Sequence, residues 1–171
     1  MKTKRQAELV DAFLANLGGD AAPVYSALID ALGVHGYHPN KAGANLTFKH
    51  DAHNKQMAKM GIRTGKAPHP FFSLRFSACR DYSDRFGDIV RATIDKYPAK
   101  YARCPDGGCS YCAGEPETHI YSYEALDGQR RTQCGAYAME IPNVTMSDVD
   151  EIKRLIGEEH GYLMTYEAGR A

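Results

Sequence analysis

The segment Phe71-Phe72-Ser73-Leu74-Arg75-Phe76-Ser77-Ala78 decides the fold, because apolar side chains alternate along it with serine and arginine. A period of two predicts a β-strand with one buried face. Leu46 and Phe48 show the same alternation, and a further strand is expected over about 56–63. The links between these segments are too short for a helical crossover, so we expect three antiparallel strands.

Helices are predicted both before and after these strands in the sequence. Apolar residues at helical spacing before Gly18-Gly19 predict a helix over about 4–17, and Asp20 is expected to cap a second helix, so that residues 1–36 form a helical hairpin. Residues 35–44 are rich in Gly, Pro, Asn and His and are expected to form a loop. Two further helices are predicted, over about 81–97 and from Ser147 to a stop at Gly157 or Gly161.

A β-hairpin is expected between the two later helices, with strands over 119–125 and 131–141 and a turn at Asp127-Gly128. The predicted fold is therefore α+β: an N-terminal helical hairpin, an antiparallel sheet, two further helices and a cysteine-stapled β-hairpin. Residues 1–171 are expected to form a single domain, with the helical hairpin in 1–36 and the sheet, helices and cysteine-rich hairpin in 45–160.

Composition narrows the class of protein. Hydrophobic residues make up 43% and charged residues 25% of the 171-residue chain, as in ordinary globular domains. No apolar run approaches the ~20 residues that a membrane span requires. Glu8 and Asp11 interrupt the N-terminal segment where a secretory signal would be apolar, so we expect a cytoplasmic protein. The formal net charge is zero, although basic residues are concentrated between Lys41 and Arg75.

Four cysteines in the C-terminal half, Cys104, Cys109, Cys112 and Cys134, carry the clearest chemical signal. Neighbouring glycines allow the backbone to turn tightly, and four converging thiolates complete a closed zinc site. A structural zinc would hold a loop and hairpin that have few apolar residues of their own. We therefore expect a zinc-stabilised binding or interaction domain for an unknown ligand or protein partner.

The same cysteines resemble the cluster loop of plant-type [2Fe–2S] ferredoxins, which have C-x4-C-x2-C followed later by a fourth cysteine. Gly108-Cys109-Ser110 and Cys112-Ala113-Gly114 are similar to the residues that flank the ligands in that family. The resemblance implies a [2Fe–2S] cluster and electron transfer as an alternative. Pro105-Asp106 after the first cysteine and an early fourth cysteine depart from the ferredoxin pattern.

A thiol-redox protein, with Cys109 and Cys112 as a C-x-x-C pair, is a further alternative. Cys79 ends an apolar strand and is expected to be a buried small hydrophobe. The chain contains no P-loop, nucleophile elbow, H-E-x-x-H or dinucleotide motif, so an enzyme assignment has no positive support and stays open.

Three other sets of residues are candidates for binding. Arg63, Lys66 and Arg75 form a basic set that could bind an anion, or could simply be a solvated strand face. The pairs His35/His38 and His50/His53 lie in polar segments, where we expect solvated loop histidines.

Tyrosines and arginines near the cysteines could form a stacking surface for nucleic acid, although tyrosines on hairpin strands also pack across the strands. The tyrosines are Tyr97, Tyr101, Tyr111, Tyr121, Tyr123 and Tyr137, and the arginines are Arg103, Arg130 and Arg131.

The order of these features also resembles a family of small, uncharacterised bacterial cytoplasmic proteins. The residues that carry this resemblance are Phe71 to Phe76, Cys134-Gly135 and Glu151 to Ile156. It implies a bacterial, cytoplasmic setting and no particular activity.

Overall fold

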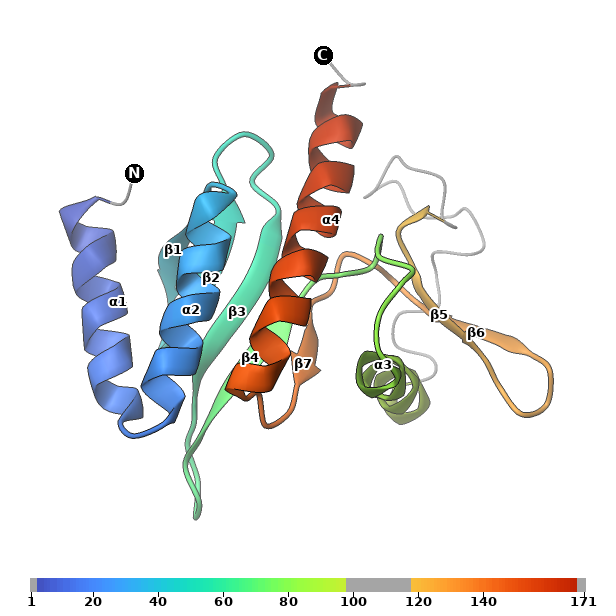
Figure 1. Ribbon diagram of the computed structural model, residues 1–171, viewed down its shortest axis with the longest axis horizontal. Coiled ribbons are helices and arrows are strands. Elements are labelled where there is room, and N and C mark those ends of the chain that lie inside the picture. Colours follow the sequence, from blue (N-terminus) through green and yellow to red (C-terminus); the bar gives the residue numbers. More distant parts are fainter. Residues whose placement is uncertain (1–2, 98–117, 169–171) are drawn as a thin grey trace.

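The computed structural model describes residues 3–97 and 118–168 and confirms the α+β fold. Two N-terminal helices precede a five-stranded antiparallel sheet, and a separate two-stranded hairpin lies beside it (Figure 1). The helices are α1 (Lys4–Leu17), α2 (Ala21–Val34), α3 (Asp84–Lys96), the 3-10 turn η2 (Met146–Asp148) and α4 (Val149–Ala168). The strands are β1 (Tyr37–Ala42), β2 (Asn45–His50), β3 (Gln56–Arg63), β4 (His69–Leu74), β5 (Tyr121–Glu124), β6 (Arg130–Gln133) and β7 (Met139–Ile141).

The N-terminal helices begin and end for local reasons. The Thr3 hydroxyl accepts the Gln6 N–H, and the Gln6 side chain accepts the Thr3 N–H, so a reciprocal capping box starts α1. Gly18 ends α1 with a φ of 63°, a conformation that glycine adopts without strain. This agrees with the helical hairpin expected from the sequence.

The sheet has the strand order β1-β2-β3-β4-β7, with every neighbouring pair antiparallel. Side chains of Leu46, Met60, Phe72 and Ile141 lie in one row across β2, β3, β4 and β7, and all four are buried in the core. The next row, on the opposite face, consists of Thr47, Lys59, Ser73 and Glu140. The alternation expected from the sequence therefore separates an apolar from a polar face.

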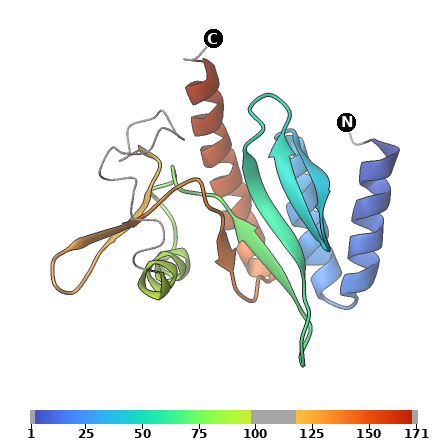
Figure 2. The same ribbon diagram turned by 180° about the vertical axis from the view of Figure 1, so that it is seen from behind.

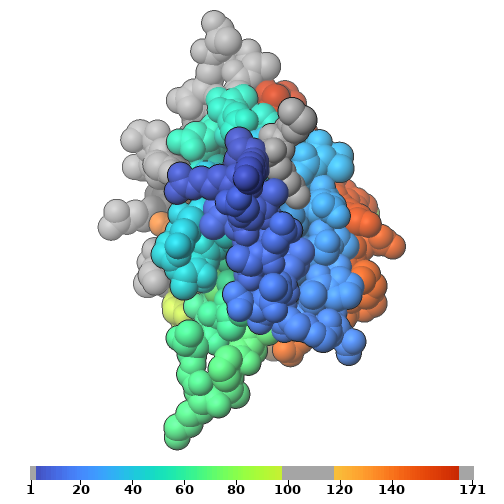
Figure 3. Space-filling model, turned by 90° about the vertical axis from the view of Figure 1, so that its left-hand side faces the viewer, coloured from blue at the N-terminus to red at the C-terminus, as the bar shows by residue number. Residues whose placement is uncertain are grey.

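Helices α2 and α4 lie over the apolar face, and α1 covers the side beside β1 and α2 (Figures 1 and 3). Turning the molecule by 180° brings the opposite face of the sheet to the front, with α2 and α4 behind it (Figure 2). We call this second face the open face. It ends at α3, which lies beside the edge strand β7.

Three expectations from the sequence are corrected. Residues 37–42 form edge strand β1 rather than a loop, because their pairing with β2 outweighs the weak strand preference of Pro39 and Asn40. The returning strand expected over 131–141 is two strands, and β7 joins the main sheet instead of the hairpin. Helix α4 continues through Gly157 and Gly161, where a stop was predicted.

Gly157 lies within α4, near the end of α2. A Cβ atom at this position would lie 3.7 Å from Nε2 of His35, which is ordinary van der Waals contact, so the packing does not require a glycine here. The burial of Ile152, Leu155, Ile156 and Leu163 in the core outweighs the low helix propensity of the glycine and carries α4 through it.

A buried ion pair joins the end of β4 to α4. Arg75 Nε donates to Glu159 Oε1 at 2.6 Å, and the two residues are 4% and 0% exposed. The same carboxylate accepts the Ser77 hydroxyl at 3.2 Å and the Ala78 N–H at 2.7 Å. One glutamate therefore holds the whole segment that follows β4.

The β5–β6 hairpin is attached at the same place. A Cβ atom at Gly135 would lie 1.5 Å from the His119 carbonyl oxygen, so only glycine allows the two backbones to come this close. The Ser77 hydroxyl also donates to the Gly135 carbonyl at 3.0 Å. The buried Tyr121 hydroxyl accepts the Phe76 N–H at 3.0 Å and donates to the Tyr137 carbonyl at 3.1 Å.

We expect Glu159→Ala to lower the free energy of unfolding by about 3–5 kcal/mol, because it removes the carboxylate that pairs with the buried Arg75 guanidinium and accepts the Ser77 hydroxyl and the Ala78 N–H. Urea denaturation measures the change. The matched control is Glu158→Ala on the same helix, whose ion pair with Arg154 is exposed and should contribute at most about 1 kcal/mol. Equal losses in the two variants would contradict the central role of Glu159.

Candidate functional site

A groove of about 990 Å³ lies between the open face of the sheet and α3. Its floor includes Lys59, Ser73 and Glu140 from adjacent strands. One wall is a stripe of α3 residues at helical spacing, from Arg85 and Ile89 to Lys96, with Tyr97 directly after the helix. The segment between β6 and β7 supplies Tyr137. The groove thus combines residues that are up to about eighty positions apart in sequence.

Four cationic and two acidic side chains line this groove. Two of the cations have partners: Arg63 is paired with Glu140, and Arg85 with Asp148 at 2.9 Å. Among the described residues, no carboxylate forms an ion pair with Lys59 or Lys96. These two lysines give the groove an excess of positive charge.

Aromatic rings lie beside the cations. The Arg63 guanidinium is 4.2 Å from the centroid of the Phe71 ring, and Lys59 Nζ is 6.0 Å from it. Lys96 Nζ lies 5.3 Å from the centroid of the Tyr97 ring. Tyr97 and Tyr137 are 41% and 46% exposed, so solvent reaches both.

Gly61 makes room for the Phe71 ring on the open face. A Cβ atom at Gly61 would lie 2.9 Å from Phe71 Cε1 and 2.1 Å from Asn45 Oδ1. The Phe71 ring therefore occupies the space beside the glycine of the neighbouring strand and is only 5% exposed. This arrangement also places its ring under Arg63.

Gln133 adds a polar group to the groove. It is 4% exposed, and within the described parts of the chain its Oε1 has no hydrogen-bond partner. A buried acceptor without a partner is unfavourable, so a donor on a ligand in the groove would stabilise it.

The three basic residues predicted to bind an anion, Arg63, Lys66 and Arg75, lie in three different environments. Arg63 lines the groove, and Lys66 is exposed in the turn between β3 and β4. Arg75 is buried against Glu159 and cannot reach an anion on the open face, which corrects its place in that set. Lys59 and Lys96 were missed, because only the pairing of β3 and β4 beside α3 brings them together.

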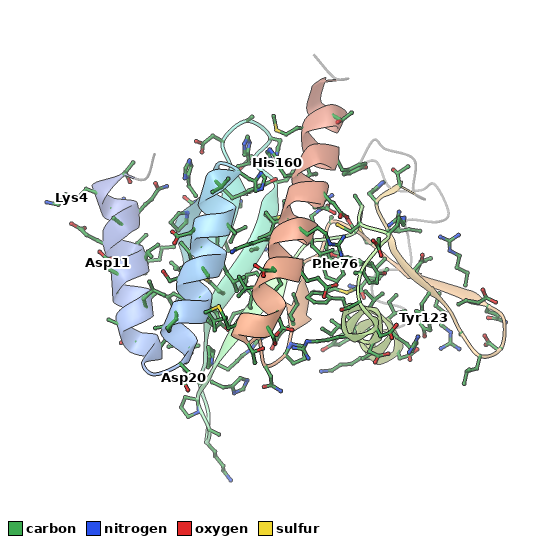
Figure 4. The ribbon with its side chains drawn as sticks, in the orientation of Figure 1. Lys4, Asp11, Asp20, Phe76, Tyr123 and His160 are labelled. Atoms are coloured by element: carbon green, nitrogen blue, oxygen red, sulfur yellow. The ribbon has the colours of Figure 1, made fainter. Side chains whose placement is uncertain are left out.

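The tyrosines selected from the sequence are also divided. Tyr97 and Tyr137 line the groove, whereas Tyr121 is buried in the core. Tyr123 faces α3 from the hairpin, where its hydroxyl donates to Asp95; this hydrogen bond raises its pKa (Figure 4). Tyr101 and Tyr111 lie outside the described residues.

Of the predicted metal ligands, Cys104, Cys109 and Cys112 lie outside the described residues. Cys134 is a half-buried free thiol directly after β6, next to the close contact of Gly135 with His119. Cys79 is 2% exposed, as expected for a small hydrophobe, and burial raises the pKa of its thiol. Within residues 3–97 and 118–168, no three His, Cys, Asp or Glu side chains are arranged to hold a metal ion.

A second polar cluster lies at the opposite end of the sheet, where α2, α4 and the β2–β3 turn meet. His50 and His53 stack with ring centroids 4.6 Å apart, and His160 lies 4.8 Å from His35 and 5.6 Å from His50 (Figure 4). His53 is buried, which corrects the expectation of a solvated loop histidine. His160 belongs to the cluster although no local pattern in the sequence indicated it.

Hydrogen bonds order this cluster around Tyr37. His53 Nδ1 accepts the Lys55 N–H at 3.1 Å, which leaves the proton of the neutral ring on Nε2. That Nε2 lies 3.4 Å from the Tyr37 hydroxyl, which in turn lies 3.3 Å from His160 Nδ1. Burial raises the pKa of Tyr37, so its hydroxyl stays protonated and can donate to His160.

Comparisons of the chain with protein-family models, with curated proteins and with solved structures found no match. In the described part of the chain, no helix has the length and apolar character needed to cross a membrane. The groove and the cysteines therefore provide the observations on which a function can be argued.

We expect the protein to lose stability as the pH falls through about 6.5, the ordinary pKa of histidine. Burial, with the neighbouring His35 and His50, lowers the pKa of His160. The unfolded chain therefore takes up this proton at a higher pH than the folded chain, and protonation favours unfolding. Above that range the ring is neutral in both states and the effect vanishes.

Urea denaturation at about pH 7.5 and about pH 5.5 measures this loss. His160→Gln should reduce it, whereas His69→Gln, at an exposed position in β4, should not. The explanation fails if both variants keep the full pH dependence of the parent protein.

Proposed function

We propose that the protein is a binding domain stabilised by a structural zinc ion, and that its groove takes an anionic ligand. The observation that carries the proposal is the position of Lys59 and Lys96 in the groove, with no carboxylate paired to either among the described residues. A ligand that carries negative charge would be attracted there. The exposed Tyr97 and Tyr137 rings add apolar contact area beside these charges.

The zinc ion would be held by the thiolates of Cys104, Cys109, Cys112 and Cys134. Cys134 supports this part of the proposal, because it is a free, half-buried thiol at the base of the hairpin. His119, close to where the described chain resumes after the other three cysteines, lies against Gly135, the residue directly after Cys134. Zinc would supply cross-links and no reaction step, since four thiolates leave no open coordination position.

Elemental analysis of anaerobically purified protein should give about one zinc per chain and no visible colour. Cys109→Ser, Cys112→Ser and Cys134→Ser should each reduce the zinc content and lower the free energy of unfolding by several kcal/mol, because metal-binding energy contributes to folding. Cys79→Ser is the control, because this buried thiol donates to the Leu155 carbonyl and is not among the proposed ligands.

Other results would redirect the assignment. Iron with sulfide and a brown colour would indicate the electron-transfer alternative. Metal-free protein that is equally insensitive to all four cysteine substitutions would remove the zinc site from the proposal.

Anion binding is tested with linear inorganic polyphosphate, which carries charge but no rings. We expect Lys59→Gln/Lys96→Gln to weaken its binding about ten-fold or more in isothermal titration calorimetry at low salt. The matched control is Lys4→Gln/Lys153→Gln, which removes two charges from α1 and α4, on the other side of the sheet (Figure 4). Equal affinities for the two double variants, or no binding by the parent protein, would contradict the anion-binding groove.

A further inference from the structure

We infer that the anionic ligand of the groove is a single-stranded nucleic acid, whose phosphates contact Lys59 and Lys96 and whose bases stack on Tyr97 and Tyr137. The inference rests on the proposed anion-binding function and adds the class of ligand. It depends on one juxtaposition: two exposed aromatic rings, Tyr97 and Tyr137, line the same groove as two lysines that have no carboxylate partner within the part of the chain that the structure describes.

The shape of the groove favours a polymer over a small anion. The α3 wall runs from Arg85 to Tyr97, which at 1.5 Å per residue is roughly 18 Å. At the axial rise of about 3.4 Å per nucleotide of a strand with stacked bases, that length corresponds to at most roughly five nucleotides. Small ligands are usually enclosed on most sides, whereas this groove is bounded by the sheet face on one side and α3 on the other.

The positions of the charges and rings favour nucleic acid over an acidic peptide. Base-to-ring stacking is the usual way in which proteins hold single strands without reading every base. Tyr97 follows Lys96 at the end of α3, and Tyr137 enters the same groove from the β6–β7 segment, so two rings flank the cationic floor. An acidic peptide would also be attracted to the lysines, but its carboxylate side chains have no planar ring that could stack on these exposed tyrosines.

Gln133 supplies a group that can contact a base edge. Its buried Oε1 has no partner within the described residues, and the N–H groups of base edges, including N3–H of thymine and uracil, are donors that a glutamine oxygen accepts. A polyphosphate presents acceptors only, so it cannot donate to this oxygen. Bases rather than phosphates therefore complete the hydrogen bonding of the groove.

Arg63 and Arg85 line the groove, but their guanidinium groups are already bound to other groups of the protein. Arg63 is held by Glu140 and the Phe71 ring, and Arg85 by Asp148 and the Pro142 carbonyl. These bonds leave the two lysines as the cations that can follow a phosphate backbone.

The test compares three ligands of about twelve units by fluorescence anisotropy or competition: a single-stranded oligonucleotide, an abasic oligonucleotide of equal length and linear polyphosphate. Oligo-dT and oligo-U are separate arms, which distinguish DNA from RNA. We expect the oligonucleotide with bases to bind at least about ten-fold more tightly than the abasic strand, because two stacked bases are lost in the latter. A duplex of the same length should bind more weakly than the single strand.

The variants separate stacking from charge. Tyr97→Ala and Tyr137→Ala should each weaken oligonucleotide binding about 5- to 100-fold and leave polyphosphate binding within about two-fold of the parent protein. Tyr137→Phe keeps the ring and should bind like the parent. Lys59→Gln and Lys96→Gln should each remove about one phosphate contact. The slope of log K for single-strand binding against the logarithm of the salt concentration should therefore become shallower by about 0.7 in each variant.

Two outcomes overturn the inference in distinguishable ways. If the abasic strand and polyphosphate bind as tightly as the oligonucleotide with bases, the groove binds anions but not nucleic acid, and the proposed function survives. If neither polyphosphate nor any oligonucleotide binds at low salt, the proposed function fails together with the inference. Preference for the duplex would also overturn it, because a duplex cannot place its bases on the two tyrosines.

Discussion

The buried carboxylate of Glu159 is the group on which the rest of the structure depends. Glu159 lies in the middle of α4 and accepts hydrogen bonds from three groups in the segment that follows β4. The donors are the Arg75 guanidinium, the Ser77 hydroxyl and the Ala78 backbone N–H. Burying the charges of Arg75 and Glu159 is favourable only when both groups keep their hydrogen bonds. The segment after β4 and α4 therefore have one favourable relative position. The hairpin joins at the same point through Ser77, Gly135 and Tyr121, where a side chain on Gly135 would collide with His119.

The groove follows from this arrangement. With α2 and α4 held on the apolar face, the rows of side chains on the other face of the sheet lie beside α3, which packs against β7. Strand pairing then places Lys59, Ser73 and Glu140 in one row across β3, β4 and β7, and Lys96 of α3 and Tyr97 directly after it line the same groove. The ion pair between Arg75, directly after β4, and Glu159 thus helps to hold α4 on the apolar face, and the other face stays accessible to a ligand.

Parts of the candidate site could be expected from local sequence. The metal site is a prediction from the spacing and glycines of the cysteine segment alone, because ligands for a small ion must lie close together, and three of its four cysteines lie outside the described residues. Arg63 was also identified, since strand period and charge are local properties. Arg75 was misplaced: it continues the alternation of Phe71 and Ser73, but β4 ends at Leu74 and the side chain turns to Glu159. The histidine cluster was missed because Tyr37 and His160 are 123 residues apart.

The sequence by itself determined the class of fold, the two N-terminal helices, strands β2 to β4 and the burial of Cys79. Each of these depends on the period of apolar residues or on a stop signal within a few positions. Only the tertiary structure decided that residues 37–42 are a strand, that α4 passes Gly157, that β7 leaves the hairpin for the main sheet, and that Lys59 and Lys96 share a groove. Those outcomes depend on partners distant in sequence, whose packing and hydrogen-bond energies exceed the small local preferences of glycine, proline and asparagine.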